Sequence, residues 1–337
     1  MSLSPPPVTG ENWTTLRNKT YLEMYAPKMV FSSICMVVCL FGLVGNGIVA
    51  FFLAFRIKKN NFTIYILNLT VADFMFLLCT LFLTFHITFV NVHQKALARH
   101  LDLNDVVKVV MSFVVACLFG YNTSLYLLTV ISVERCLSVL YPIWYQCRRP
   151  KHQTAIVCCV TWMLSCLVTA LECISCDKPM FVFEIQEYSA RYSKLCRAAS
   201  VFTGLLSFLI FTPLMILSSV TLLIKVKRDS RKQQPSKLYV VIVATVVLFL
   251  MFGMPIRVML QVEYKYETFL PLIVVEVSSL LSSINSSVNP FVYWFVGRWV
   301  GGKGSFLMIF LRIFREDGHK ENHQGVVTNR NKAETML

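Results

Sequence analysis

Charged and strongly polar side chains stand inside long apolar stretches of this sequence, and they are the residues that could do chemistry. Inside a bilayer such groups are costly, so they usually mark a binding site, an ion path or a switch. The charged ones are Asp73, Glu134, Arg135, Glu172, Arg257 and Glu276. The neutral hydrogen-bonding ones include Asn46, Ser124, Asn285 and Asn289. We expect the functional sites among these residues.

The elements that must position these residues are seven apolar stretches, each long enough for the roughly 20 helical residues that cross a bilayer. They cover residues 29–55, 64–90, 105–138, 153–176, 198–224, 237–262 and 269–296. The polar residues 91–105 are expected to form mostly loop. The chain has 337 residues, of which 56% are apolar and 15% charged, against about 45–50% and 25% in soluble domains. The sequence therefore predicts an all-α membrane protein, a seven-transmembrane helix bundle.

The positive charges indicate how this bundle lies in the membrane. Basic residues gather in the loops after the first, third and fifth stretches, which are expected to face the cytoplasm. Residues 1–28 are then an extracellular N-terminal segment, and two sequons there predict glycosylation at Asn12 and Asn18. The net charge of +14 lies in short loops between apolar runs, so we expect no nucleic-acid partner.

The seven-transmembrane domain is expected to span residues 29–296, followed by two cytoplasmic segments. Residues 297–315 have an apolar face and flanking basic residues, which predicts an amphipathic helix on the lipid of the inner leaflet. Residues 316–337 are polar and predict a disordered tail.

Prolines inside the apolar stretches predict hinges. Pro213, Pro255 and Pro290 each remove a backbone hydrogen bond and can kink a helix. In the sixth stretch such a kink would let the inner half swing outward.

Asp73 is the costliest group of the core unless polar groups surround it. Asn46, Ser124, Asn285 and Asn289 come from other stretches and could do so. A carboxylate with several neutral oxygens suits a hard cation, so an allosteric Na⁺ is one interpretation. A hydrogen-bonded cluster with water and no ion is the other. We expect no required cofactor and no other metal.

Enzymes, transporters and channels fit the sequence poorly. It has no His-x-x-x-His metal pair, no Gly-x-Ser-x-Gly and no paired intramembrane aspartates. Inverted repeats and Gly/Pro-broken helix pairs, which transporters usually show, are not visible, and neither is a pore ring or filter.

Each stretch carries a marker, and together the markers resemble rhodopsin-like (class A) G-protein-coupled receptors over about residues 29–315. In order they are Asn46, Asp73, Glu134-Arg135, Trp162, Pro213, Pro255 and the N-P-F-V-Y of Asn289 to Tyr293. The segment from Tyr121 to Gln153, N-F-T-I-Y-I-L-N-L near Asn61 and I-N-S-S-V-N-P near Ile284 are similar to the Mas-related receptors. The resemblance implies a multi-pass plasma-membrane receptor that binds an extracellular ligand and activates a heterotrimeric G protein, usually of the Gq or Gi class.

The resemblance also assigns a G-protein switch. Arg135 and Tyr293 would act at the cytoplasmic mouth, with Glu134 as the adjacent counter-ion of Arg135 at rest. The alternative without a signalling role is that Arg135 extends its charged end to the membrane–water interface. The start of the sixth stretch reads R-K-Q-Q-P-S-K, without the acid that often holds this arginine. An orphan or constitutively active receptor is therefore the alternative function.

Two positions depart from the class A pattern. The third-stretch cysteine of the usual disulfide is replaced by Val110, and the resemblance to Mas-related receptors implies a Cys176–Cys196 bridge instead, with Cys173 as a competing partner. The usual tryptophan two residues before Pro255 is replaced by Gly253. A large aromatic trigger is thus expected to be absent there.

The expected ligand pocket contains Glu172, Arg257 and Glu276. Mas-related receptors commonly use an acid at the position of Glu172 to hold cationic ligands, so the partner would be a peptide or a small cationic molecule. A glutamate that reaches headgroups or Lys178 is the alternative. Arg257 could pair with Glu276 or meet a ligand carboxylate.

Overall fold

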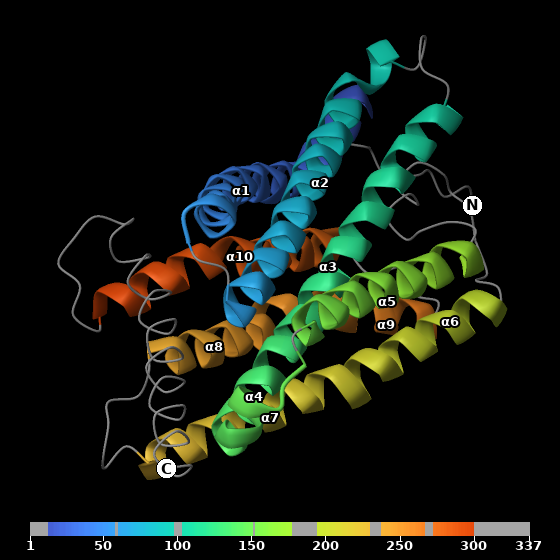
Figure 1. Cartoon of the computed structure of the whole chain (residues 1–337). Coiled ribbons are helices and arrows are strands. Elements are labelled where there is room, and N and C mark those ends of the chain that lie inside the picture. The colour runs from blue at the N-terminus through green and yellow to red at the C-terminus, as the bar shows by residue number, and fades with distance from the viewer. Residues whose placement is uncertain are drawn as a thin grey trace, which may run out of the picture.

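The computed structural model describes residues 13–57, 60–97, 103–150, 152–176, 194–229, 237–266 and 272–299, and almost all of these residues are helical (Figure 1). The helices before residue 177 are α1 (Trp13–Phe55), α2 (Asn61–Leu97), α3 (Leu103–Leu140), α4 (Pro142–Cys147) and α5 (Gln153–Ser175). Those after it are α6 (Lys194–Leu205), η2 (Leu206–Phe211), α7 (Thr212–Asp229), α8 (Lys237–Leu248), η3 (Phe249–Gly253), α9 (Met254–Tyr266) and α10 (Leu272–Trp299).

Apart from the six-residue helix α4, the described helices form seven rods, because α6–η2–α7 run on without a break and so do α8–η3–α9. Helix α3 lies at the centre and contacts α2, α5, α7 and α8, while α1 packs on α2 and α10 (Figure 1). Among the described residues, six rods are long and apolar enough to cross a membrane. The seventh, α10, is the most polar because it carries many buried serines and asparagines. These groups face the other rods, as expected for polar residues at membrane depth.

The start of α2 has a reciprocal cap. The side-chain oxygen of Asn60 accepts the Thr63 backbone N–H at 2.7 Å, and the Thr63 hydroxyl accepts the Asn60 N–H at 2.9 Å. Two otherwise unpaired donors are satisfied, which fixes where the helix begins. The far end differs from expectation, since α2 continues to Leu97 and α3 begins at Leu103. Residues 91–97 and 103–105 are thus helical and not loop, because a polar segment can extend a helix beyond the apolar span.

Two of the expected hinges follow π-helical turns. The turn η2 ends two residues before Pro213, and η3 ends two residues before Pro255. A proline ring clashes with the carbonyl four residues earlier, which is Leu209 or Met251, and the wider π-turn accommodates it. Pro290 lies inside α10. All three prolines therefore interrupt regular helical hydrogen bonding within the bundle.

Small residues let α1 approach α10. A Cβ atom at Gly42 would overlap the Ser287 side chain, and the Asn46 amide donates to the Ser286 carbonyl at 3.0 Å. The glycine is required by close packing and not by backbone conformation, since it lies in a continuous helix.

Some expected features lie outside the described residues. Asn12 is one, and the Asn18 side chain belongs to the undescribed side chains at the start of α1. The expected amphipathic helix at 297–315 and the tail at 316–337 lie almost wholly beyond Trp299, where the description ends.

Candidate functional site

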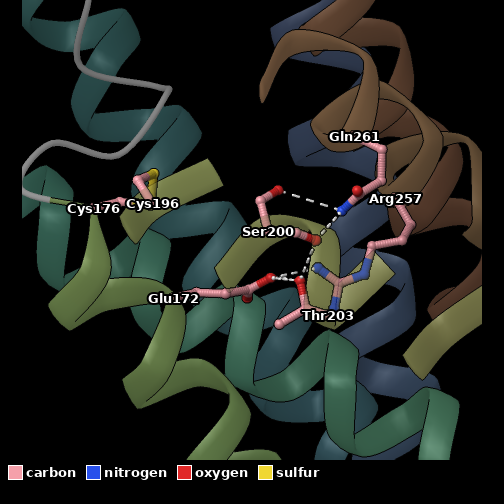
Figure 2. The surroundings of a disulfide bond; sticks show 7 residues. All are labelled: Glu172, Cys176, Cys196, Ser200, Thr203, Arg257 and Gln261. Atoms are coloured by element: carbon pink, nitrogen blue, oxygen red, sulfur yellow. Dashed lines mark hydrogen bonds and ion pairs between the residues drawn. A yellow bond between two sulfur atoms is a disulfide. The ribbon is translucent and has the colours of Figure 1, made fainter. Parts of the chain in front are cut away.

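The largest fully buried side chain among the described residues is Arg257, on the first turn of α9. Its Nη1 donates to the Glu172 carboxylate of α5 at 2.8 Å, and the arginine side chain is 0% exposed (Figure 2). A buried charge is tolerated when it is paired and fully hydrogen-bonded. Of the two possibilities that the sequence left open for Arg257, the structure shows neither pairing with Glu276 nor presentation to a ligand, since the fully buried guanidinium contacts Glu172.

Neutral groups complete the environment of this ion pair. Arg257 also donates to Asn122 of α3 at 2.8 Å and to Ser207 of η2 at 3.2 Å. The Thr203 hydroxyl donates to the same Glu172 oxygen at 2.7 Å. Four rods are joined here, because one guanidinium offers donors in several fixed directions.

The pair lies below the disulfide of the same end of the bundle. Cys176, directly after α5, is bonded to Cys196 on α6, which confirms the expected bridge and leaves Cys173 free (Figure 2). One helical turn further along α6, Ser200 accepts a hydrogen bond from Gln261 of α9 at 2.9 Å. The bridge and this contact hold α5, α6 and α9 together at what we call the disulfide end.

A cavity of about 60 Å³ opens at the disulfide end between α1, α2, α3, α9 and α10. Its walls are mainly apolar, and Glu276 of α10 is the one charged side chain among the described residues that line it. The Ser32 hydroxyl donates to Glu276 at 3.3 Å. Glu276 therefore lies at a cavity, whereas Glu172 and Arg257 are not among the residues that line it.

Tyr121 connects this cavity to the core. Its side chain lines the cavity, and its ring stacks on Phe249 with 6.1 Å between centroids. Phe249 is fully buried and packs against Gly253, where a Cβ atom would come within 2.8 Å of the ring. An aromatic ring thus fills the space beside Gly253, although position 253 itself carries no side chain. The sequence did not reveal it because the ring comes from one turn earlier in the same rod.

Asp73 is completely enclosed in the middle of the bundle. One carboxylate oxygen accepts from Ser124 at 2.9 Å and the other from Asn289 at 2.7 Å. Asn46 and Asn285 are buried as well. Asn46, however, bonds to backbone carbonyls of α1 and α10 and not to Asp73. The cluster offers carboxylate and hydroxyl oxygens that fit a hard cation.

At the opposite end, Glu134 is bound by residues other than its neighbour. Both carboxylate oxygens accept from Arg149 at 3.1 Å, and one also accepts from Tyr65 at 2.9 Å. The Arg135 guanidinium lies 3.7 Å from the centroid of the Phe62 ring. These contacts correct the expectation that Glu134 holds Arg135. The physical reason is that successive helical residues point in different directions. Tyr293 is buried in α10.

The comparisons with known proteins agree with this architecture. Residues 45–293 match the family model described as 7 transmembrane receptor (rhodopsin family). The mouse protein named Proto-oncogene Mas is 42% identical over 253 residues, which are 75% of this chain and 73% of that protein. The rat Mas-related G-protein coupled receptor member H is 44% identical over 74% of this chain and 71% of that protein.

The chain belongs to the Mas-related receptors of the rhodopsin family. The resemblance read from the sequence is thereby confirmed, and so is the seven-helix fold. The receptor is a multi-pass plasma-membrane protein and not an enzyme. Membership implies a ligand and a heterotrimeric G protein as partners.

Several residues of the receptor's core escaped the sequence reasoning. They are Tyr65, Asn122, Arg149, Thr203, Ser207 and Phe249. Asn122 had a signal, since an amide in an apolar stretch needs a buried partner. Thr203, Ser207 and Phe249 gave none, because serines, threonines and phenylalanines are frequent in transmembrane helices.

Proposed function

We propose that this receptor binds an extracellular peptide at the disulfide end and activates a heterotrimeric G protein of the Gq or Gi class. The N-terminus and the disulfide end would then face outside, and the end with Arg135 would face the cytoplasm. The basic loops at the Arg135 end support this orientation. The names of the relatives support the coupling to G proteins.

The observation that carries the proposal is the rod α8–η3–α9. Arg257 fixes its outer half to α5 and α3, while its inner half contacts α3 and α7. Between the halves lie the π-turn η3 and Pro255, where the helix can bend at least cost. A ligand that prefers one arrangement of the outer half would shift the population of the inner half.

The test is ligand-dependent nucleotide exchange on co-expressed Gq and Gi proteins during a peptide screen. We expect Arg135→Ala to abolish exchange at unchanged surface expression, because this arginine would contact the G protein. Arg56→Ala removes an exposed arginine at the same end and serves as the control. Full exchange in the Arg135→Ala receptor would contradict the assigned switch.

A second candidate function is a receptor that signals without a dedicated ligand. It is favoured by the position of Glu134, whose carboxylate is shared between Arg149 and Tyr65. Exchange above that of cells with empty vector, in the absence of any peptide, would support it. Exchange at the empty-vector level would reject it.

We also propose that the cluster around Asp73 holds an allosteric Na⁺. Asp73 and Ser124 supply oxygens of the kind that hard cations prefer. Such an ion would link α2 and α3 and favour the conformation in which they lie together.

A further inference from the structure

Arg135 contacts an aromatic ring of a neighbouring helix. Its guanidinium carbon lies over the Phe62 ring of α2, 3.7 Å from the ring centroid. A cation within about 6 Å of the centroid is attracted to the negatively charged face of the ring, and this attraction grows as the pair is removed from water. The neighbouring acid, Glu134, is bound by Arg149 and Tyr65. The ring contact is therefore a restraint on Arg135 that does not involve Glu134.

The start of α2 fixes the position of this ring. Phe62 is the second residue of the helix and lies within the reciprocal cap formed by Asn60 and Thr63. Its side chain is 7% exposed and belongs to the main apolar core of the bundle. Core side chains are closely packed and have little room to move. We therefore expect the ring to stay in place when the Arg135 guanidinium moves away from it.

The same helix also binds the neighbouring acid. Tyr65 lies three residues after Phe62 and donates to Glu134 at 2.9 Å. Residues three apart lie on the same side of a helix, so one side of α2 contacts both Glu134 and Arg135. Residues 231–237, at the start of the sixth apolar stretch, contain no acid that could bind the arginine. The Phe62 ring is thus a candidate for the group that restrains Arg135.

We propose that Phe62 is a positioning residue that holds Arg135 in the resting receptor. This inference rests on the proposed function and adds what restrains its switch. In the resting state the guanidinium lies on the ring, and it leaves the ring when it contacts the G protein. The contact stabilises the resting state alone, so weakening it shifts the population towards the active state without any ligand.

The experiment changes the charge distribution of the ring and leaves its shape nearly unchanged. In the full receptor, Phe62 is replaced by phenylalanine that carries one, two or three ring fluorines, which withdraw electrons from the ring face. Ligand-free nucleotide exchange on purified Gq and Gi proteins and the thermal unfolding midpoint are measured in lipid nanodiscs. We expect exchange to rise with each fluorine, by about tenfold over the series, which is the range of one partly buried cation–π contact.

Two controls separate this contact from general effects of fluorine. Phe55 is an exposed phenylalanine at the same end of the bundle, and its ring contacts Phe51. The same fluorines at Phe55 should leave ligand-free exchange unchanged. In the Arg135→Ala receptor no guanidinium faces Phe62, so the stepwise fall of the unfolding midpoint expected with Arg135 present should disappear. Phe62→Leu, which removes the ring, should raise ligand-free exchange at least as much as three fluorines.

Three results would contradict different parts of the inference. Ligand-free exchange that does not change with fluorine number, in a receptor that a peptide activates, would overturn the restraint by Phe62. An equal effect of the fluorines on the unfolding midpoint with and without Arg135 would overturn the contact itself. An absence of exchange with every peptide and every variant would contradict the proposed function, and the unfolding midpoints would then decide whether Phe62 holds Arg135.

Discussion

The Arg257 guanidinium and the Glu172 carboxylate lie 2.8 Å apart although 85 residues separate them in the chain. This ion pair neutralises the acid that the sequence assigned to cationic ligands. It also places a fully buried charge in the rod with the π-turn η3 and Pro255. Arg257 and Thr203 both bind one oxygen of the Glu172 carboxylate, and the other oxygen has no hydrogen-bond partner among the described residues. We therefore expect that removing this ion pair lowers the stability of the receptor more than it changes the selectivity for ligands.

Breaking this pair from one side should destabilise the receptor strongly. Arg257→Met leaves the Glu172 charge buried, and Glu172→Gln leaves Arg257 uncompensated, at a cost of about 3–5 kcal/mol each. The double variant buries no charge and should recover a large part of that loss. Thermal unfolding in nanodiscs measures all three. Strictly additive effects would show that the two residues do not interact.

Removing the Cys176–Cys196 bridge should cost about 3 kcal/mol, because its residues lie 20 apart and the bond restricts the unfolded chain. Cys176→Ser, Cys196→Ser and the double variant should lower the unfolding midpoint equally, since each removes the same bond. Cys173→Ser is the matched control, because that thiol is free. A loss of stability in Cys173→Ser as large as in Cys176→Ser would favour the competing pairing.

Adding a side chain at position 253 should disturb the ring beside it. Gly253→Ala puts a Cβ within 2.8 Å of Phe249, and overpacking of this kind costs about 1–3 kcal/mol. The same change combined with Phe249→Leu should cost less than the sum of the single changes. Unfolding midpoints of the three variants give the coupling. No coupling would mean that the ring is not confined by the missing side chain.

The stability of the receptor should depend on the contact between the buried Glu134 and Arg149. Arg149→Ala removes the cation that contacts both oxygens of Glu134 and should lower stability by about 3–5 kcal/mol, since Glu134 stays buried. Arg148→Ala removes an exposed arginine next to it and should change stability little. Comparable losses in both variants would contradict the structural importance of the Glu134–Arg149 contact.

The sodium proposal predicts a cation-specific stabilisation. Replacing choline chloride by sodium chloride at constant ionic strength should raise the unfolding midpoint of the unmodified receptor, because Na⁺ would bind the folded state. Asp73→Asn should abolish this difference, since it removes the charge in the cluster. An equal response of both receptors to sodium would mean that Asp73 holds no ion.

The sequence by itself determined the class of fold and the family. Hydrophobic length predicted the helix Gln153–Ser175 almost to the residue, because a bilayer imposes a fixed length on each crossing. The family motifs placed Asp73, Arg135 and Pro255 in their spans, because each motif belongs to one helix of the receptor family. The Cys176–Cys196 pairing was also available from the family resemblance.

Only the tertiary structure decided which polar residues meet. A charge inside an apolar stretch indicates that the residue has a buried partner, but several acids and hydrogen-bond donors on other helices could be that partner. The rotation of each helix about its axis selects one of them. That rotation pairs Arg257 with Glu172 and not with Glu276, and it pairs Glu134 with Arg149. It also put the Phe249 ring into the space beside Gly253. These choices depend on packing between helices far apart in the chain, which no local sequence pattern records.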